Sequence, residues 1–254
     1  MVLDSFRLDG RVALVTGGNR GIGQALATAL AQAGADVALL GRGDPGGTVA
    51  RVAALGRRTL VVHTDLATAT PNELADAVAT VTANLGGLDI LVNNAGTIRR
   101  ADAADHSPDD WDAVLRVNLD AVFHLSRAAG RHMLPRGAGK IINIASMLSF
   151  QGGIRVPSYT AAKHAVVGLT RALANEWAAR GVNVNAIAPG YIATDNTAPL
   201  RADVDRERAI RERIPAGRWG DPDDLTGAAV FLASDAARYV HGAVLPVDGG
   251  WLAR

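Results

Sequence analysis

Short runs of consecutive apolar residues alternate with longer helical stretches along the chain. Because several of these runs are apolar at every position, they predict strands that are buried on both faces of a sheet. The predicted strands span residues 12–15, 37–40, 60–63, 90–92, 141–144, 182–186 and 244–247. The predicted helices span residues 23–33, 71–85, 108–133, 158–179 and 222–233. This order predicts the α/β class: a doubly wound parallel sheet of about seven strands with helices on both faces.

No linker, repeat or low-complexity segment interrupts this pattern, so we expect a single domain over residues 1–254. The most polar stretch, residues 201–213, is rich in Arg, Glu and Asp. It is typical of a solvated helix with intrahelical ion pairs. Because it follows residues 189–194 late in the chain, a mobile lid over a cleft is the alternative interpretation.

The composition narrows the classes of function. The chain has 26 cationic side chains, of which only Lys140 and Lys163 are lysines, 25 acidic ones and a net charge of +1. No run of basic residues indicates a nucleic-acid partner. The absence of cysteine and the spacing of the six histidines indicate neither thiol chemistry nor a metal site. With no membrane span and no targeting segment in the pattern, we expect a cytoplasmic protein that binds a small molecule.

A glycine-rich turn at residues 16–23, with the sequence TGGNRGIG, follows the first predicted strand and opens the first helix. In a parallel sheet this position brings the phosphates of a dinucleotide against backbone N–H groups at a helix N-terminus. Glycine lets the backbone approach the phosphates, and Gly23 allows helix and strand to pack closely. The pattern therefore predicts a Rossmann-type site in roughly residues 10–140, with catalytic and substrate groups in roughly residues 140–254.

The end of the second strand bears on the choice between NAD and NADP. An NAD site usually offers an acid here, but the chain has Gly41 and Arg42. Arg42, with Arg20 from the first turn, could pair with a 2′-phosphate and so favours NADP; both could instead be solvated surface residues. Asp65 could accept a hydrogen bond from the adenine amino group, and Asn93 begins a turn that borders the same cleft.

Four residues form a candidate catalytic set. Tyr159 and Lys163 lie four positions apart, on one face of a helix. We expect the Lys163 ammonium to lower the pKa of Tyr159, so that the phenol can exchange a proton with a substrate hydroxyl. Ser146 follows a buried strand and could hold the substrate oxygen. Asn118 falls within the predicted helix 108–133, where its amide needs a partner; a hydrogen bond to a neighbouring turn is the structural alternative to a catalytic role.

These motifs together resemble the short-chain dehydrogenase/reductase family over nearly the whole chain. The resemblance implies a catalytic tetrad of Asn118, Ser146, Tyr159 and Lys163, an NAD or NADP cofactor, and a homotetramer. The residues that it and the glycine turn assign to the cofactor are Gly17, Asn19, Arg20, Gly21, Ile22, Gly23, Arg42, Asp65, Leu66, Asn93, Ala95, Gly96, Tyr159, Lys163, Pro189, Gly190, Ile192 and Thr194.

Residues 97–100, 141–159, 213–220 and 247–254 are similar to members of that family that act on deoxy sugar acids, 2-dehydro-3-deoxy-D-gluconate or 2-deoxy-D-gluconate. Such members usually prefer NAD, whereas Arg20 and Arg42 favour NADP. A sugar acid needs a partner for its carboxylate, and Arg155 is the hypothesis, with a bracing role as the alternative. The candidate substrate residues are Arg99, Arg100, Met147, Gln151, Arg155 and Tyr191.

Three other functions remain open from the sequence. The same machinery could serve a gluconate 5-dehydrogenase or a 3-oxoacyl thioester reductase, although no basic entrance for an acyl carrier is evident. The chain could also bind NAD(P) as a sensor without turnover. The paired Tyr159 and Lys163 favour an enzyme, because a protein that only binds the nucleotide needs no such pair.

Overall fold

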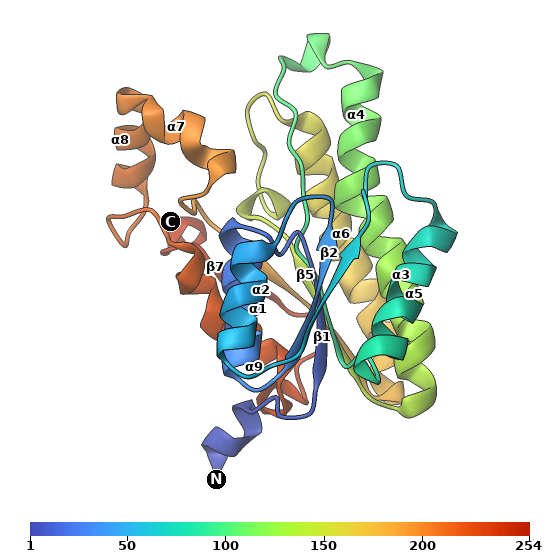
Figure 1. Ribbon diagram of the computed structural model, residues 1–254. Coiled ribbons are helices and arrows are strands. Elements are labelled where there is room, and N and C mark those ends of the chain that lie inside the picture. The colour runs from blue at the N-terminus through green and yellow to red at the C-terminus, as the bar shows by residue number, and fades with distance from the viewer.

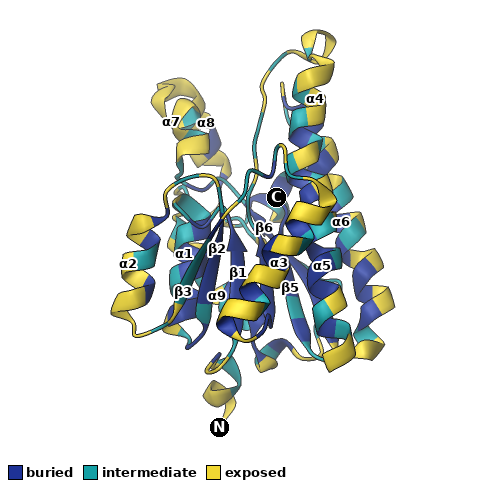
Figure 2. Cartoon of the chain, turned by 45° about the vertical axis from the view of Figure 1, so that its right-hand side comes forward, coloured by how far each residue is buried: buried dark blue, intermediate teal, exposed yellow.

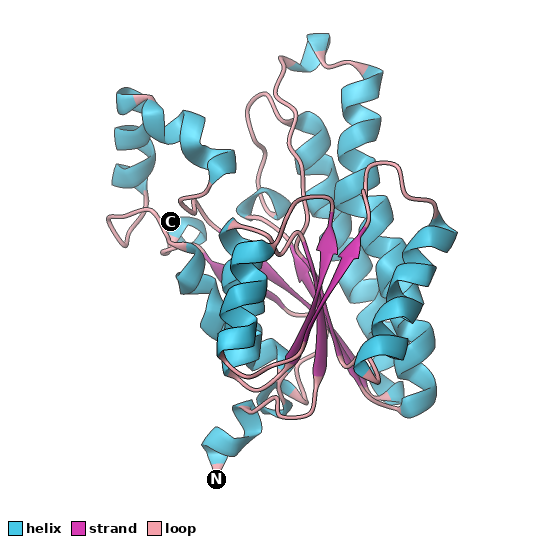
Figure 3. Cartoon of the chain, in the orientation of Figure 1, coloured by secondary structure: helices cyan, strands magenta, loops and turns pink.

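Seven parallel strands form one sheet in the order β3-β2-β1-β4-β5-β6-β7. The computed structural model describes all 254 residues. The strands are β1 (Val12–Thr16), β2 (Asp36–Gly41), β3 (Thr59–His63), β4 (Ile90–Asn93), β5 (Gly139–Ile144), β6 (Val182–Pro189) and β7 (Val244–Val247). The strand order reverses direction at β1 and β4, which is where doubly wound sheets bind their ligands. The predicted fold class is confirmed (Figure 3).

Helices cover both faces of the sheet (Figure 1). They are α1 (Gly21–Gln32), α2 (Gly46–Ala54), α3 (Pro71–Leu85), α4 (Pro108–Leu115), α5 (Ala121–Arg136), α6 (Pro157–Trp177), α7 (Ala198–Ala202), α8 (Val204–Arg213) and α9 (Thr226–Ala233). One apolar core joins the sheet to α3, α5 and α6, and a second joins it to α1, α2 and α9. Figure 2 shows the strands buried between these two layers.

Two predicted helices differ from the structure. The stretch 108–133 consists of α4, a π-helical turn over Arg116–Asp120, and α5, which continues past Pro135. In the stretch 222–233, a 3₁₀ turn, Pro222–Leu225, precedes α9. Helix α2 was not predicted, because it opens on Gly46 and Gly47 and buries only Thr48 and Val52. The parallel pairing of β2 with β3 requires such a crossover.

The polar stretch 201–213 lies mainly on α8, and α7 and α8 stand apart from the rest of the chain (Figures 1 and 2). Arg208 pairs with Asp205 at 2.6 Å and Arg211 with Glu207 at 3.1 Å, so the predicted intrahelical ion pairs are confirmed. A lid movement of these helices stays a prediction. No helix in the structure is both long enough and apolar enough to span a membrane.

Candidate active site

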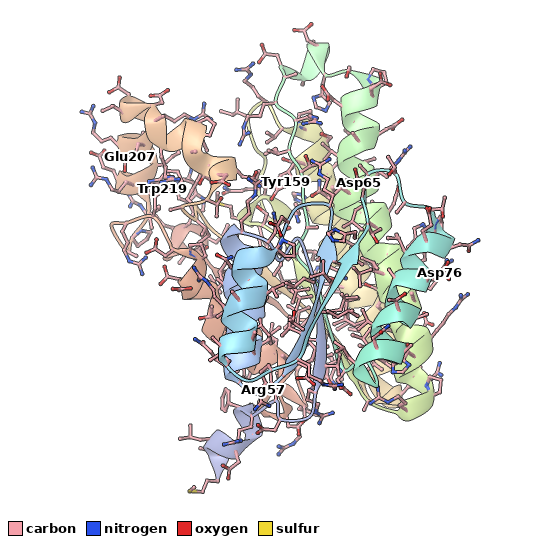
Figure 4. The ribbon with its side chains drawn as sticks, viewed as in Figure 1. Arg57, Asp65, Asp76, Tyr159, Glu207 and Trp219 are labelled. Carbon is pink, nitrogen blue, oxygen red and sulfur yellow. The ribbon has the colours of Figure 1, made fainter.

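An open cleft of about 680 Å³ lies at the carboxyl edge of the sheet. The segments that follow β1 to β6 form its walls, so residues distant in the sequence meet there. Ser146, Tyr159 and Lys163 line it, as does every residue predicted to bind the cofactor except Asn93. Figure 4 shows Tyr159 and Asp65 at this end of the sheet, with Glu207 and Trp219 toward α7 and α8.

The glycine turn is shaped to receive phosphate groups. Gly17 and Gly21 have φ angles of +64° and +53°, which side chains rarely adopt. A Cβ atom on Gly23 would lie 2.2 Å from the carbonyl oxygen of Gly17, so only glycine fits there. No side chain caps the N-terminus of the 12-residue helix α1, whose first three residues line the cleft. Its free N–H groups and its dipole fit a nucleotide pyrophosphate.

Thr16 and Asn94 hold this turn; each lies within a motif of the sequence, residues 16–23 or 93–96, that assigns it no role of its own. Thr16 Oγ1 accepts hydrogen bonds from the backbone N–H groups of Asn94 (3.0 Å) and Ala95 (2.9 Å). Asn94 Nδ2 donates to the carbonyl oxygens of Thr16 (2.8 Å) and Gly17 (3.3 Å). The ends of β1 and β4 are thereby joined below the turn. The positions of these two residues at adjacent strand ends are the one signal that the sequence offers for them.

The structure corrects the placement of Asn93. Its side chain is 3% exposed, and its Nδ2 donates to Ser126 Oγ (3.0 Å) and Asn143 Oδ1 (2.9 Å) within the core. Successive residues of a strand point to opposite faces, so Asn93 and Asn94 cannot both face the turn. Asn94 lines the cleft and Asn93 supports the core beside it.

Both arginines of the predicted 2′-phosphate site line the cleft, and each is paired with an acid. Arg20 Nη1 lies 2.8 Å from Asp195 Oδ2, and Arg42 Nη1 lies 3.5 Å from Asp65 Oδ2. Their side chains are 70% and 78% exposed, so a phosphate could reach them. At the end of β2, Gly41 leaves open space, because a Cβ atom there would have no neighbour closer than 3.8 Å. These features suit the bulk and charge of a phosphate.

Ser146, Tyr159 and Lys163 meet where β5 ends and α6 begins. Ser146 Oγ accepts a hydrogen bond from the backbone N–H of Leu148 (3.1 Å), and Ser146 lies near enough to Tyr159 to act on the pKa of the phenol. Lys163 is 4% exposed, and its Nζ donates to the carbonyl oxygen of Ile144 (2.6 Å). The Lys163 Nζ lies 5.5 Å from the centre of the Tyr159 ring.

The predicted effect of Lys163 on the pKa of Tyr159 is wrong for this arrangement. Burial raises the pKa of the Tyr159 phenol, while the hydrogen bond with Ser146 and the charge of Arg100 act in the lowering direction. Burial also lowers the pKa of Lys163 to about 8. The ammonium is directed at a backbone carbonyl instead of the phenol, and its desolvation weakens the charged form. The protein's own groups therefore favour a protonated Tyr159.

Asn118 is fully buried in the π-helical turn and lies behind the cleft wall. Its Oδ1 accepts from the backbone N–H of Thr97 (3.1 Å), and its Nδ2 donates to the carbonyl oxygens of Thr97 (2.8 Å) and Val114 (2.9 Å). The hydrogen bond to a neighbouring turn, one of the two interpretations of the sequence, is thus present. Asn118 fixes the segment that follows β4, and π-helical turns often mark functional sites.

The candidate substrate arginines differ in placement. Arg100 does not line the cleft; its Nη2 donates to the carbonyl oxygen of Asn196 (3.2 Å), and its charge has the smallest of the three effects on the pKa of Tyr159, in the lowering direction. Arg99 lines the cleft and its Nε lies 3.2 Å from Asp110 Oδ1. Arg155 does not line the cleft, and its Nε lies 3.0 Å from Asp102 Oδ1. The structure thus brings Arg99 to the cleft and leaves Arg155 outside it, while Arg100 acts on the catalytic tyrosine only through its charge.

The other three candidate substrate residues, Met147, Gln151 and Tyr191, do not line the cleft. Met147 is 5% exposed in an apolar cluster beneath α8, against which Tyr191 packs. The Tyr191 ring lies 5.2 Å from that of Trp219 and 4.8 Å from that of Trp251, between centres. The sequence patterns do not show that Trp219 and Trp251 pack on Tyr191, because both tryptophans lie 28 or more positions further along the chain.

The fold, the glycine turn and the grouping of Ser146, Tyr159 and Lys163 define a class of protein. The sequence family described as enoyl-(acyl carrier protein) reductase matches residues 17–252. The chain belongs to the short-chain dehydrogenase/reductase family of oxidoreductases.

Individual members of the family are similar over the full length. The 2-dehydro-3-deoxy-D-gluconate 5-dehydrogenase of Dickeya dadantii is 55% identical over 255 residues, which cover 100% of both chains. A solved structure from Agrobacterium tumefaciens, assigned as a 2-deoxy-D-gluconate 3-dehydrogenase with bound NADP, is 58% identical with a TM-score of 0.93, covering 98% of this chain and 99% of that one. The gluconate 5-dehydrogenase of Burkholderia cenocepacia, in complex with NADP and tartrate, is 43% identical with a TM-score of 0.95 and full coverage of both chains.

Proposed function

We propose that the protein is an NADP-dependent dehydrogenase of a deoxy sugar acid, with 2-dehydro-3-deoxy-D-gluconate (position 5) or 2-deoxy-D-gluconate (position 3) as substrate. The observation that carries this proposal is the meeting of Ser146, Tyr159 and Lys163 with the glycine turn in one cleft, which Arg99 also lines. Arg99 and the adjacent Arg100 lie on one loop, and cations there suit a substrate that carries a carboxylate on the same carbon chain as its reacting hydroxyl. The full-length similarity to the Dickeya and Agrobacterium proteins supports the same substrate class.

Tyr159 is the residue that would exchange a proton with the substrate oxygen. The phenol, which burial favours, is the form that donates a proton to a ketone. Ser146, which lines the same cleft as Tyr159, would hold the same oxygen. Lys163 would bind the nicotinamide ribose from its buried position, and Asn118 would keep Thr97 and the cleft wall in place. The bound nicotinamide supplies the hydride, or accepts it in the reverse direction.

NADP is the cofactor that the mouth of the cleft supports best. Arg20 and Arg42 are two exposed cations on either side of the free space at Gly41, and β2 ends without an acid for a ribose hydroxyl. Both similar solved structures contain NADP. In this arrangement the 2′-phosphate would compete with Asp195 and Asp65 for the two arginines.

We expect Arg100→Ala to lower kcat/KM for the sugar acid by about 10- to 100-fold, because a charge-assisted pair contributes about 1.5–3 kcal/mol. For oxidation of a neutral polyol of the same length, the same variant should change kcat/KM much less. Steady-state rates with the two substrates measure the difference. Arg180→Ala, an exposed arginine before β6, is the matched control and should behave as the wild type. An equal loss on both substrates would show that Arg100 does not recognise the carboxylate.

Gluconate is the second candidate substrate. The B. cenocepacia protein, a gluconate 5-dehydrogenase, shares 43% of its residues with this chain, fewer than the two similar deoxy-sugar-acid proteins share. Gluconate differs in having a hydroxyl at the deoxy position, so relative rates with the two acids separate these functions. The sensor and thioester reductase interpretations lack a supporting feature of comparable strength.

We further propose a homotetramer in the cytoplasm. Trp111 on α4 and Phe123 on α5 are each 38% exposed, and the apolar edge strand β7 has no neighbour on its outer side. Exposed apolar surface of this kind is typical of subunit contacts. Light scattering on the purified protein should give four times the chain mass of 26.3 kDa, and a monomer mass would contradict the proposal.

A further inference from the structure

Two loops at the top of the cleft are joined by a pair of contacts. One loop spans residues 97–106 and carries Arg99 and Arg100; the other spans residues 150–156 and leads into α6. Arg155 Nε lies 3.0 Å from Asp102 Oδ1, and the backbone N–H of Ala101 donates to the carbonyl oxygen of Arg155 (3.2 Å). Side chain and backbone of Arg155 therefore both hold the arginine-bearing loop.

The backbone of Arg155 is itself unusual. Its φ angle is +63°, and it is the only residue other than glycine with a positive φ in the chain. An L-residue in this conformation is strained, and such strain persists where surrounding contacts fix it, often at functional sites. Here the fixing contacts are those with Ala101 and Asp102. A glycine at position 155 would relieve the backbone strain, but the chain would then lose the cation that binds Asp102.

A third contact joins the same two segments closer to the catalytic tyrosine. A nitrogen of His106, Nε2, lies 3.0 Å from Ser158 Oγ. Ser158 is fully buried in the first turn of α6 and directly precedes Tyr159. The loop with the arginines is thus attached both before the start of α6 and at the residue adjacent to the catalytic phenol.

We propose that Asp102, His106, Arg155 and Ser158 form a clamp that sets the position of the loop bearing Arg99 and Arg100 relative to Tyr159. The clamp rests on the proposed function, since it adds specificity for an acid by holding the carboxylate-binding loop at a fixed separation from the reacting oxygen. Arg155 is then a positioning residue and not a ligand of the substrate. Small displacements of a positioned group can lower catalytic rates strongly, so contacts outside the cleft can determine substrate preference.

The test is a double-mutant cycle of Asp102→Ala and Arg155→Ala, with steady-state kinetics of oxidation of the sugar acid and of a neutral polyol. We expect each single variant to lower kcat/KM for the acid by about three- to tenfold, and the double variant to lose no more than either, because coupled residues are not additive. The kcat/KM for the neutral polyol should change by less than about twofold. Arg155→Lys keeps a cation that can reach Asp102 and should recover most of the activity.

Asp102→Ala distinguishes a positioning role of Arg155 from direct binding of the substrate carboxylate by Arg155, because the two roles predict opposite results. If Arg155 bound the substrate carboxylate directly, Arg155→Ala would be far more damaging than Asp102→Ala, and removing Asp102 would leave the activity unchanged or higher. That result would overturn the clamp. Arg7→Ala is the matched control, because it removes an exposed ion pair with Asp9 near the N-terminus, remote from the cleft.

Hydrogen exchange of the Ala101 amide tests the clamp without any substrate. This N–H is bonded to the Arg155 carbonyl, so it should exchange faster in both single variants than in the wild type and the Arg7→Ala control. Unchanged exchange would contradict the clamp even if the enzyme oxidises sugar acids. Faster exchange together with no turnover of any sugar acid would instead overturn the proposed function and leave the contact between the loops established.

Discussion

Tyr159→Phe should lower kcat by about 10²- to 10⁴-fold, the range that a positioned proton-transfer group contributes. The substitution removes only the hydroxyl, so the ring still fills its place beside Lys163 and Ser146. In the proposed mechanism this hydroxyl transfers the proton, and Ser146 only holds the same oxygen, so we expect no neighbour to replace it. The binding of NADPH, measured by its fluorescence, should change little in the same variant.

Tyr239→Phe is the matched control for this prediction. Tyr239 is 95% exposed and follows the 3₁₀ turn after α9, so loss of its hydroxyl should leave turnover unchanged. Near-normal turnover in Tyr159→Phe would remove the tyrosine from the mechanism. A loss of NADPH binding equal to the loss of turnover would assign it to nucleotide binding alone.

Lys163→Met should abolish most activity, by about 10²-fold or more, and should also change how stability depends on pH. Burial lowers the pKa of Lys163 to about 8, from an ordinary value of 10.5. Between these values the unfolded chain holds a proton that the folded chain has released, so the stability of the wild type rises with pH in this window. Below pH 8 the folded protein carries the buried charge, which costs about 3 kcal/mol over the full shift.

Lys163→Met lacks the buried ammonium, and it shares all other titrating groups with the wild type. The free energy of unfolding of the wild type, minus that of Lys163→Met, should therefore rise by about 2 kcal/mol between about pH 7.5 and 9.5. Urea unfolding at several pH values measures it. Lys140→Met replaces the only other lysine, which lies at the amino edge of the sheet beside Asn183, and should retain activity. A difference that does not change with pH would contradict the depressed pKa.

The sheet and the glycine turn could be predicted because local patterns determine them. Buried parallel strands are apolar at consecutive positions, and a phosphate-binding turn needs glycine at fixed places. Helix α2 lacks such a pattern, since two glycines begin it and few apolar side chains face the core. Its existence follows only from the requirement that β2 and β3 be parallel.

The sequence predicts which residues belong to the site, but it shows much less of which atoms these residues contact. The spacing of Tyr159 and Lys163 identifies the pair, but spacing does not show that the Lys163 ammonium bonds to Ile144. Likewise Arg155 is a candidate in the sequence because it lies between Ser146 and Tyr159. Only the folded chain shows that Asp102 binds it and that Arg99 lines the cleft from another loop.

The most direct test of the account measures wild-type turnover with both cofactors and three acids. NADP and NAD are each offered with 2-dehydro-3-deoxy-D-gluconate, 2-deoxy-D-gluconate and gluconate, and formation of the reduced nicotinamide is followed by absorbance. We predict the highest kcat/KM for NADP with a deoxy sugar acid, above that for gluconate. Turnover of a neutral polyol alone, or none with any of the three acids, would contradict the proposed function.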